Sequence, residues 1–352
     1  MQKKYREEKD LKNMALTTEI LEELPYFLKE FFRGITDSKT SATRLNYAYD
    51  LRNFFNYLIT HEYVFKHRVL KDIDLNDLDK ITSDMLEAFL DFTTYYEKET
   101  THQSIVRTNK ERGKSRKLSA IKTMFAYFLK KKKISTNPAI LVETPKIREK
   151  TIVRLEIDEV ARLLDSVEQG DNLTKTQKKY HNLTKKRDLA ILTLFLGTGI
   201  RVSECVGIDL EHINFDINAI KIIRKGGNES IIYIGSEVEE ALKSYIEDRL
   251  KLNPLEGYEN ALFLSMQNKR LTDRAVQNLV KKYTKQINLL KNISPHKLRS
   301  TYGTNLYKET GDIYLVATIL GHKDVNTTKK HYAQMDIDIQ RRAANVVKLR
   351  KS

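Results

Sequence analysis

The sequence predicts a mainly α-helical protein of two domains, with a small β-element in the second. Over most of the chain, apolar residues recur at steps of three and four, which gives each helix one apolar stripe. Prolines and charges interrupt this pattern at 138–152, as is typical of a linker. Further on, an isoleucine-rich segment alternates around Gly226-Gly227, which predicts a β-hairpin. We therefore expect a helical domain at 1–137, a linker at 138–152 and a second domain at 153–352.

The first domain is expected to consist of helices at 18–32, 42–58, 81–96 and 115–129. Ser115 is expected to be the N-cap of the last one. The stripe of 42–58 is formed by Ala42, Leu45, Ala48, Leu51, Phe54, Phe55 and Leu58.

The second domain is expected to begin with a helix at 156–168. A polar stretch at 170–188 separates it from a strongly apolar helix at 189–200. The hairpin follows. Further helices are expected near 236–252, 273–285, 296–308, 312–320 and 337–352.

The composition indicates a polyanionic partner. The chain has 352 residues with 62 Lys and Arg against 47 Asp and Glu, a net charge of +15 and a pI near 9.5. Such an excess favours nucleic acid, although a soluble protein that is merely basic is the plain alternative. Cys205 is the only cysteine, which excludes an intramolecular disulfide and a cysteine-based zinc site. No long apolar run or signal-peptide pattern is present, so a cytoplasmic protein that avoids membranes is expected.

Two motifs place charged residues at turns. TGIRVSE (198–204) puts Arg201 and Glu204 three residues apart on one helical face. RKGGNES (224–230) puts Lys225 at the tip of the hairpin, where a mobile ammonium could touch a phosphate or donate a proton. Each motif also has a common structural explanation. Arg201 and Glu204 could form a salt bridge at a helix start, and Lys225 could be an ordinary solvated lysine of a hairpin.

Two later motifs add histidines, an arginine and a tyrosine. SPHKLRSTYGT (294–304) carries His296, an acid or base near neutral pH, and Arg299, whose planar fork suits phosphate. LGH (320–322) ends in His322, and Tyr332 follows ten residues later. A phenol among cations is a competent nucleophile toward phosphorus, although a surface tyrosine is the more common case.

The joint chemistry of these motifs is more specific than each part. Two arginines, a lysine, two histidines and a late tyrosine suit phosphoryl transfer on DNA in which cationic side chains replace a metal ion. The motifs hold no carboxylate cluster for Mg²⁺, so we expect neither a metal nor another cofactor.

The order of these motifs resembles that of the tyrosine recombinases, the phage-integrase-type family. The length, and the lack of an extra N-terminal arm-binding domain, resemble the Xer branch, especially single-recombinase Xer proteins. Two features depart from that branch: the tyrosine lies ten residues after His322, and Gln334 stands where Xer proteins carry a second histidine. The longer spacing is similar to that of mobile-element integrases, so chromosome dimer resolution and mobile-element integration or excision both stay open.

The resemblance implies a role for each motif residue. Tyr332 would attack the scissile phosphate and form a 3′-phosphotyrosyl link. Arg201, Arg299 and His322 would bind the same phosphate through its non-bridging oxygens. This exchange would need neither metal nor ATP.

The remaining roles concern protons and orientation. His296 would assist the tyrosine as acid or base, and Lys225 would protonate the leaving 5′-oxygen. Glu204 would orient Arg201 or His296. The resemblance also implies a clamp on double-stranded DNA with an inverted-repeat core site and a tetramer on two sites. The tail at 337–352 would pack on a neighbour through Val346, Val347 and Leu349, and an accessory factor could take part.

The residues expected to contact DNA are basic or able to read base edges. They are Arg44, Arg107, Lys114, Arg116 and Lys117 in the first domain, and Arg274, Gln277 and Asn278 in the second. Two alternatives to a recombinase are a type IB topoisomerase-like enzyme that relaxes DNA and a non-catalytic DNA-binding protein of the same fold.

Overall fold

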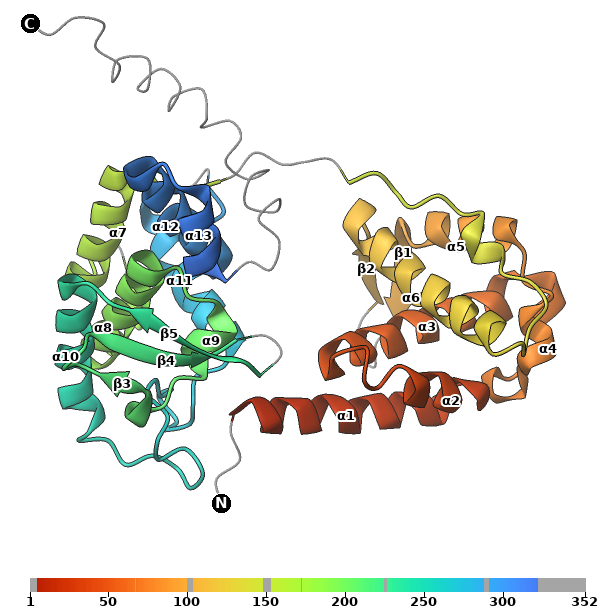
Figure 1. Ribbon diagram of the computed structural model, residues 1–352, viewed down its shortest axis with the longest axis horizontal. Helices are drawn as coiled ribbons and strands as arrows, with labels where there is room; N and C mark the ends of the chain where they lie inside the picture. The colour runs from red at the N-terminus through yellow and green to blue at the C-terminus, as the bar shows by residue number, and fades with distance from the viewer. Residues whose placement is uncertain are drawn as a thin grey trace, which may run out of the picture. The chain divides into compact units, whose positions relative to one another are not determined.

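The computed structural model divides into two compact units, Met1–Glu149 and Lys150–Ser352 (Figure 1). The division falls within the stretch expected to be a linker. The structure describes residues 5–66, 68–99, 104–147, 153–171, 173–224, 227–287 and 291–321, with the main chain alone for 96–99 and 104–107.

Unit 1 is mainly helical. Its α-helices are α1 (Tyr5–Glu23), α2 (Phe27–Gly34), α3 (Ser41–His61), α4 (Leu75–Leu78), α5 (Ser83–Phe92) and α6 (Glu111–Lys130). Its 3-10 helices are η1 (Tyr63–Phe65), η2 (Leu70–Asp72) and η3 (Pro138–Ile140), and its strands β1 (Tyr95–Glu99) and β2 (Ser104–Thr108) pair antiparallel.

The core of unit 1 is rich in phenylalanine. Phe54 of α3 and Phe89 of α5 meet edge to face at 5.2 Å between ring centroids. Phe27 of α2 and Phe128 of α6 do the same at 5.4 Å. Such pairs contribute beyond the area they bury. The aromatic core therefore holds α2, α3, α5 and α6 together.

Unit 2 combines helices with one small sheet. It contains α7 (Ile157–Gln169), α8 (Lys175–Thr198), α9 (Val202–Val206), η4 (Leu210–His212), α10 (Ser236–Arg249), α11 (Asp273–Ile287), α12 (Pro295–Thr310) and α13 (Ile313–Leu320). The sheet is antiparallel in the order β3 (Ile213–Asn214), β4 (Ala219–Ile223), β5 (Glu229–Tyr233). Helix α8 is central, in contact with α7, α10 and α12 (Figure 1).

The mainly helical fold class and the hairpin are confirmed: β4 and β5 pair with Ile223 opposite Glu229. Several boundaries differ from those expected. The helix expected at 18–32 is two helices, because Pro25 separates α1 from α2, and Ser115 lies inside α6 instead of capping it. The helix expected at 81–96 ends at Phe92, and β1 follows.

Part of the expected linker, and the polar stretch that was expected to separate two helices, are ordered parts of the units. Ala139 and Val142, at the start of the expected linker, are buried in the core of unit 1. The polar stretch at 170–188 is helical from Lys175, because Thr174 and Gln177 form a capping box there. In the part of the chain that the structure describes, no helix is long and apolar enough to cross a bilayer.

Candidate active site

Arg201 stands between the end of α8 and the start of α9. Gly199 ends α8 in the left-handed conformation, where a Cβ would lie 2.5 Å from the ring of Tyr302. The Arg201 amide donates to Glu204 Oε2 (2.9 Å) and its Nη1 donates to Oε1 (2.8 Å). The Glu204 side chain is 3% exposed and that of Arg201 33%. The buried carboxylate therefore orients a guanidinium that stays open to a ligand on one side.

Arg299 lies inside α12, one turn after His296. Pro295 begins this helix, at a position where its missing N–H has no helical partner to lose. The Arg299 side chain is buried, and its Nη1 donates to Gly199 O at 2.5 Å. Its Nη2 donates to Leu320 O at the end of α13. Arg299 thus joins the ends of α8 and α13, while His296 is exposed at the start of α12.

Three arginines converge on the last turn of α13. The hydrogen bonds run from Arg224 Nη2 to Ile319 O (3.0 Å), from Arg299 Nη2 to Leu320 O, and from Arg201 Nη2 to Gly321 O (3.1 Å). The last carbonyls of a helix lack partners within it and carry the negative end of its dipole, so cations are favoured there. This turn therefore brings together Arg201 and Arg299, two of the expected catalytic residues, from distant segments.

Arg224 is not among the residues that the sequence motifs predict to be functional. It follows the last residue of β4, and a lone arginine at a strand end is ordinarily a surface residue. Burial lowers the pKa of its guanidinium from the ordinary value; Glu204 opposes this shift and the like charge of Arg201 adds to it. Arginine has so high a pKa that Arg224 remains a cation. The structure thus adds a third arginine to the expected pair.

Three expected catalytic residues, Lys225, His322 and Tyr332, lie outside the described residues, as does the tail at 337–352 with Val346, Val347 and Leu349. Their neighbours in the sequence, Arg224 and Gly321, are described.

The expected base-reading residues share one face of α11. Arg274, Gln277 and Asn278 are exposed there. The opposite face is buried through Val276, Leu279, Val280 and Tyr283. The helical period therefore presents the three polar side chains to solvent together, as contact with a DNA groove would require.

Among the basic residues expected to bind DNA in unit 1, Lys117 is held in the interior. Its ammonium is paired with Asp50 Oδ1 at 3.4 Å, and its side chain is 4% exposed. Arg116, more exposed, contacts Asp50 Oδ2 at 2.5 Å. Burial raises the pKa of Asp50 and lowers that of Lys117. The buried position of Lys117 argues against the expected phosphate contact, because the ammonium would have to leave its carboxylate.

The other expected DNA contacts of unit 1 are less constrained. Lys114 lies 3.7 Å from Asp91, and Arg44 Nη1 donates to Thr36 Oγ1 at 3.1 Å. For Arg107 the structure describes the main chain alone.

One group of possible metal ligands occurs among the described residues. Asp209, Glu211 and His212 bring ligand atoms within 4.8 Å of one another. Arg270 already binds the Asp209 carboxylate, and His212 Nδ1 accepts the Asp209 amide at 3.1 Å. Asp209 and His212 are therefore already engaged by other groups of the protein.

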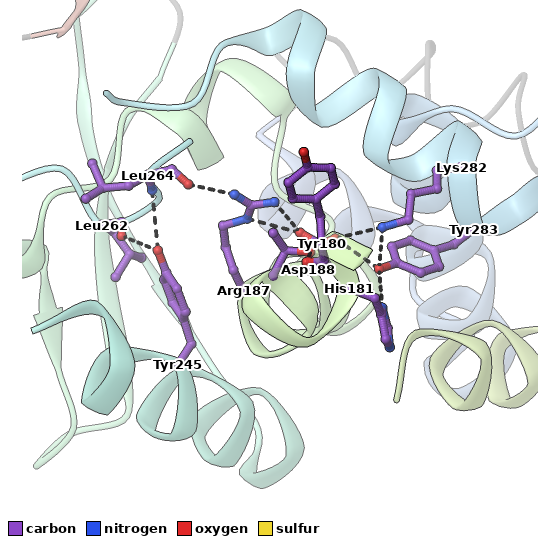
Figure 2. A network of polar contacts seen from close by, with 10 residues as sticks. Tyr180, His181, Arg187, Asp188, Tyr245, Leu262, Leu264, Lys282 and Tyr283 are labelled. Carbon is purple, nitrogen blue, oxygen red and sulfur yellow. Dashed lines mark hydrogen bonds and ion pairs between the residues drawn. The ribbon is translucent and has the colours of Figure 1, made fainter. Parts of the chain in front are cut away.

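A second polar network joins α8 to α11 and does not include the three arginines that bind the last turn of α13 (Figure 2). Asp188 accepts hydrogen bonds from Tyr283 Oη (3.0 Å) and Arg187 Nη2 (2.7 Å), and its Oδ2 lies 3.4 Å from Lys282 Nζ. His181 Nδ1 lies 3.4 Å from the Tyr283 hydroxyl. Burial raises the pKa of Tyr283 and lowers that of Lys282. Asp188 is therefore the anion on which the cations of this network depend.

Acidification is expected to destabilise unit 2 through His181. Burial lowers the pKa of this imidazole below its ordinary value of 6.5. The unfolded chain therefore takes up the proton first, and the free energy of unfolding falls as the pH drops through about 6.5, by at most about 1.4 kcal/mol per pH unit for one proton. Urea unfolding at several pH values should show a smaller pH dependence in His181→Gln than in wild type. An equal pH dependence of the free energy of unfolding in the two proteins would show that His181 is not the group responsible.

Comparison with known proteins identifies the family. Residues 153–338 match the model of the phage integrase family, and this range includes all six residues expected to be catalytic. A tyrosine recombinase XerC of Caldanaerobacter subterraneus subsp. tengcongensis is 34% identical over 334 residues, which cover 91% of this chain and 86% of the relative.

The chain belongs to the phage integrase family.

Further relatives agree with this family membership. A tyrosine recombinase XerD of Staphylococcus saprophyticus is 34% identical over 215 residues, 61% of this chain and 69% of the relative. Among solved structures, XerH recombinase bound to a palindromic difH substrate has a TM-score of 0.62 at 17% identity, over 94% of this chain and 88% of that one. A lambda integrase tetramer bound to a Holliday junction has a TM-score of 0.60 at 15% identity, over 87% of this chain and 76% of that one.

The resemblance to Xer-like tyrosine recombinases is confirmed, and the chain is a DNA strand-exchange enzyme of this type. The comparisons do not favour the topoisomerase-like enzyme or the non-catalytic DNA-binding protein. The structure also shows how Arg201 and Arg299 are held, because both donate hydrogen bonds to carbonyls at the end of α13.

Proposed function

We propose that unit 2 cleaves and rejoins DNA with Tyr332 as the nucleophile. The phenol oxygen attacks the scissile phosphorus, the bond from phosphorus to the 5′-oxygen breaks, and a 3′-phosphotyrosyl link forms. The 5′-hydroxyl of a partner strand then attacks this link and releases the tyrosine. Each step exchanges one phosphate ester for another, so ATP is not required, and a Holliday junction forms after the first pair of strands has been exchanged.

The observation that carries this proposal is the convergence of Arg201 and Arg299 on the last turn of α13. Their hydrogen bonds to the carbonyls of Gly321 and Leu320 keep two cations close together. Two adjacent guanidiniums suit the charge that develops on the non-bridging oxygens as phosphorus is attacked. His322 follows Gly321 in the sequence and would bind the same phosphate.

Proton transfer would involve the two bridging oxygens. Lys225 would donate a proton to the leaving 5′-oxygen, and His296 would accept the proton of the tyrosine. The exposed position of His296 at the start of α12 supports this role, since a base must reach the substrate. Glu204 would orient Arg201, to which it is bonded at 2.8 Å. Cationic side chains would thus do the work of a metal ion.

The proposed partner is double-stranded DNA with an inverted-repeat core site, bound by a tetramer on two sites. Similarity to XerH on a palindromic substrate and to the lambda integrase tetramer supports this proposal. Because the substrate is DNA, we also infer a cytoplasmic location at the nucleoid. Recombination between two identical sites would fit chromosome dimer resolution, whereas recombination between unlike sites would fit a mobile element.

Replacement of Tyr332 by phenylalanine is expected to abolish covalent attachment to DNA. Nicked duplexes that carry candidate core sites are incubated with the protein in EDTA and run on denaturing gels. Wild type should yield a protein–DNA adduct and Tyr332→Phe none, because the phenol oxygen is the attacking atom. Tyr233→Phe is the matched control, because it removes the hydroxyl of a tyrosine that is 73% exposed on β5.

An adduct formed by Tyr332→Phe would exclude this tyrosine as the nucleophile. Loss of the adduct in EDTA, with its return on addition of Mg²⁺, would contradict the metal-free mechanism.

Since Tyr332→Phe should still bind DNA, it also serves to count protomers by mass photometry. Four protomers on two sites are expected, and two alone would contradict the proposed tetramer.

A further inference from the structure

Arg224 occupies a defined place at the end of β4. Its amide donates to Asn228 O at 2.8 Å, and its carbonyl accepts from Gly227 N at 3.0 Å. These two bonds continue the pairing of β4 with β5 beyond Ile223 and Glu229. The main chain of Arg224 is therefore fixed by the hairpin, and the direction of its side chain is set by the sheet.

The guanidinium of Arg224 reaches the last turn of α13. Its Nη2 donates to Ile319 O at 3.0 Å. A Cβ placed on Gly321 would lie 1.4 Å from Arg224 Nη1, so the guanidinium occupies the space that any side chain at 321 would need. Gly321 also has a φ of +60°, which side chains rarely adopt. The guanidinium of Arg224 therefore packs closely against this turn, and only glycine suits position 321.

The same turn holds the two arginines expected at the phosphate. Leu320 O accepts from Arg299, and Gly321 O accepts from Arg201. A shift of this turn would move both carbonyls and with them both guanidiniums. Because misplacement by about 1 Å can cost on the order of 100-fold in rate, the contact that fixes the turn matters for catalysis.

We propose that Arg224 is a positioning residue that ties the β4–β5 hairpin to the last turn of α13 and thereby sets Arg201 and Arg299 for the phosphate. It acts through the main chain of 319–321 and does not touch the substrate. The hydrogen bond joins Arg224, the residue before Lys225 in the sequence, to Ile319, three residues before His322. The catalytic part of this inference rests on the proposed function.

The test compares Arg224→Ala with Lys221→Ala. Lys221 lies on the same strand and is paired with Glu229 at the surface (2.8 Å, 46% exposed), so its removal takes away a cation without touching α13. At saturating nicked DNA, Arg224→Ala should form the covalent adduct about 10- to 100-fold more slowly than wild type. The Kd for DNA should change by less than about threefold, since a positioning residue that does not bind DNA releases few counterions. Lys221→Ala should keep the wild-type rate.

A second readout does not depend on activity. Hydrogen exchange of the amides at 316–321 should be faster in Arg224→Ala than in wild type and Lys221→Ala, because the turn loses its tether. Arg224→Lys should give an intermediate adduct rate, since lysine keeps the charge but lacks the planar fork. A wild-type adduct rate in Arg224→Ala, or unchanged exchange at 316–321, would overturn the proposal. A different outcome is faster hydrogen exchange at 316–321 in Arg224→Ala, with no covalent adduct even from wild type. It would overturn the proposed function but would still support the role of Arg224 in fixing the last turn of α13.

Discussion

Arg299→Lys is expected to lower the rate of covalent attachment to DNA by at least about 100- to 1,000-fold, the cost of losing one well-placed donor to a developing oxyanion. The buried guanidinium of Arg299 donates to Gly199 O and Leu320 O from one plane. Lysine offers a point charge on a flexible stem and cannot reproduce this fork. It would either satisfy the carbonyls or reach the phosphate. The measurement is the single-turnover rate of adduct formation at saturating DNA.

Arg249→Lys is the matched control for this substitution. Arg249 is also buried and also donates to two main-chain carbonyls, those of Ala261 (2.9 Å) and Glu259 (2.7 Å). It lies in α10, outside the group of arginines at α13. Arg249→Lys should therefore lower stability but keep the adduct rate at temperatures where the fold persists. Equal losses of rate in both variants would show that the effect of Arg299→Lys is general destabilisation.

Asp188→Asn is expected to lower the free energy of unfolding by about 3–5 kcal/mol, the usual cost of removing one partner from a buried ion pair. The Asp188 side chain is 2% exposed, whereas Arg187 is 14% and Lys282 20% exposed. Asparagine keeps the shape but leaves both cations without an anion, and the Tyr283 hydroxyl loses its charged acceptor. Urea unfolding followed by far-UV circular dichroism measures this loss, since the chain has no tryptophan.

Asp248→Asn provides the comparison. Asp248 also faces two cations, Lys186 at 3.1 Å and Lys251 at 3.0 Å, but its side chain is 47% exposed. Ion pairs at the surface contribute at most about 1 kcal/mol, because water screens the charges. A loss in Asp188→Asn no larger than that in Asp248→Asn would contradict the claim that burial makes this network important.

The network and the candidate active site share one helix. Asp188 lies midway along α8, and Gly199 at the end of the same helix binds Arg299. Arg187 Nη1 also donates to Leu264 O at 2.8 Å, so α8 is fastened to the segment before α11 as well. A fixed α8 gives Arg201 and Arg299 a rigid support, as an active site requires.

Some features of the site were predictable because they are local. The spacing of Arg201 and Glu204 places them on one turn, and the structure has their ion pair at 2.8 Å. The sequence places Arg274, Gln277 and Asn278 within one expected helix as base-reading candidates, and the structure has all three exposed on one face of α11. Contacts within one helix follow from its 3.6-residue period, so the sequence carries them directly.

Other features could not be predicted from local sequence patterns. The charge of Lys117 indicated exposure, but its position beside Leu118 on the inner face of α6 brings it to Asp50 of α3. The polar stretch at 170–188 was expected to separate two helices, but His181, Thr184 and Asp188 recur on one face of α8 and are buried. In both cases a partner on another helix makes burial of a polar group tolerable, and no local pattern reveals that partner.

The sequence by itself predicted a mainly helical chain, the hairpin and the order of the motifs expected to be catalytic, and this order was enough to place the chain among the tyrosine recombinases. Only the tertiary structure decided that Arg201, Arg224 and Arg299 meet on one turn of α13. The contacts of Arg201 with Gly321 and of Arg224 with Ile319 join residues 120 and 95 positions apart. The physical reason is that helical and strand periods record which face of an element is buried, whereas the packing of the whole unit decides which distant carbonyl a buried guanidinium will find.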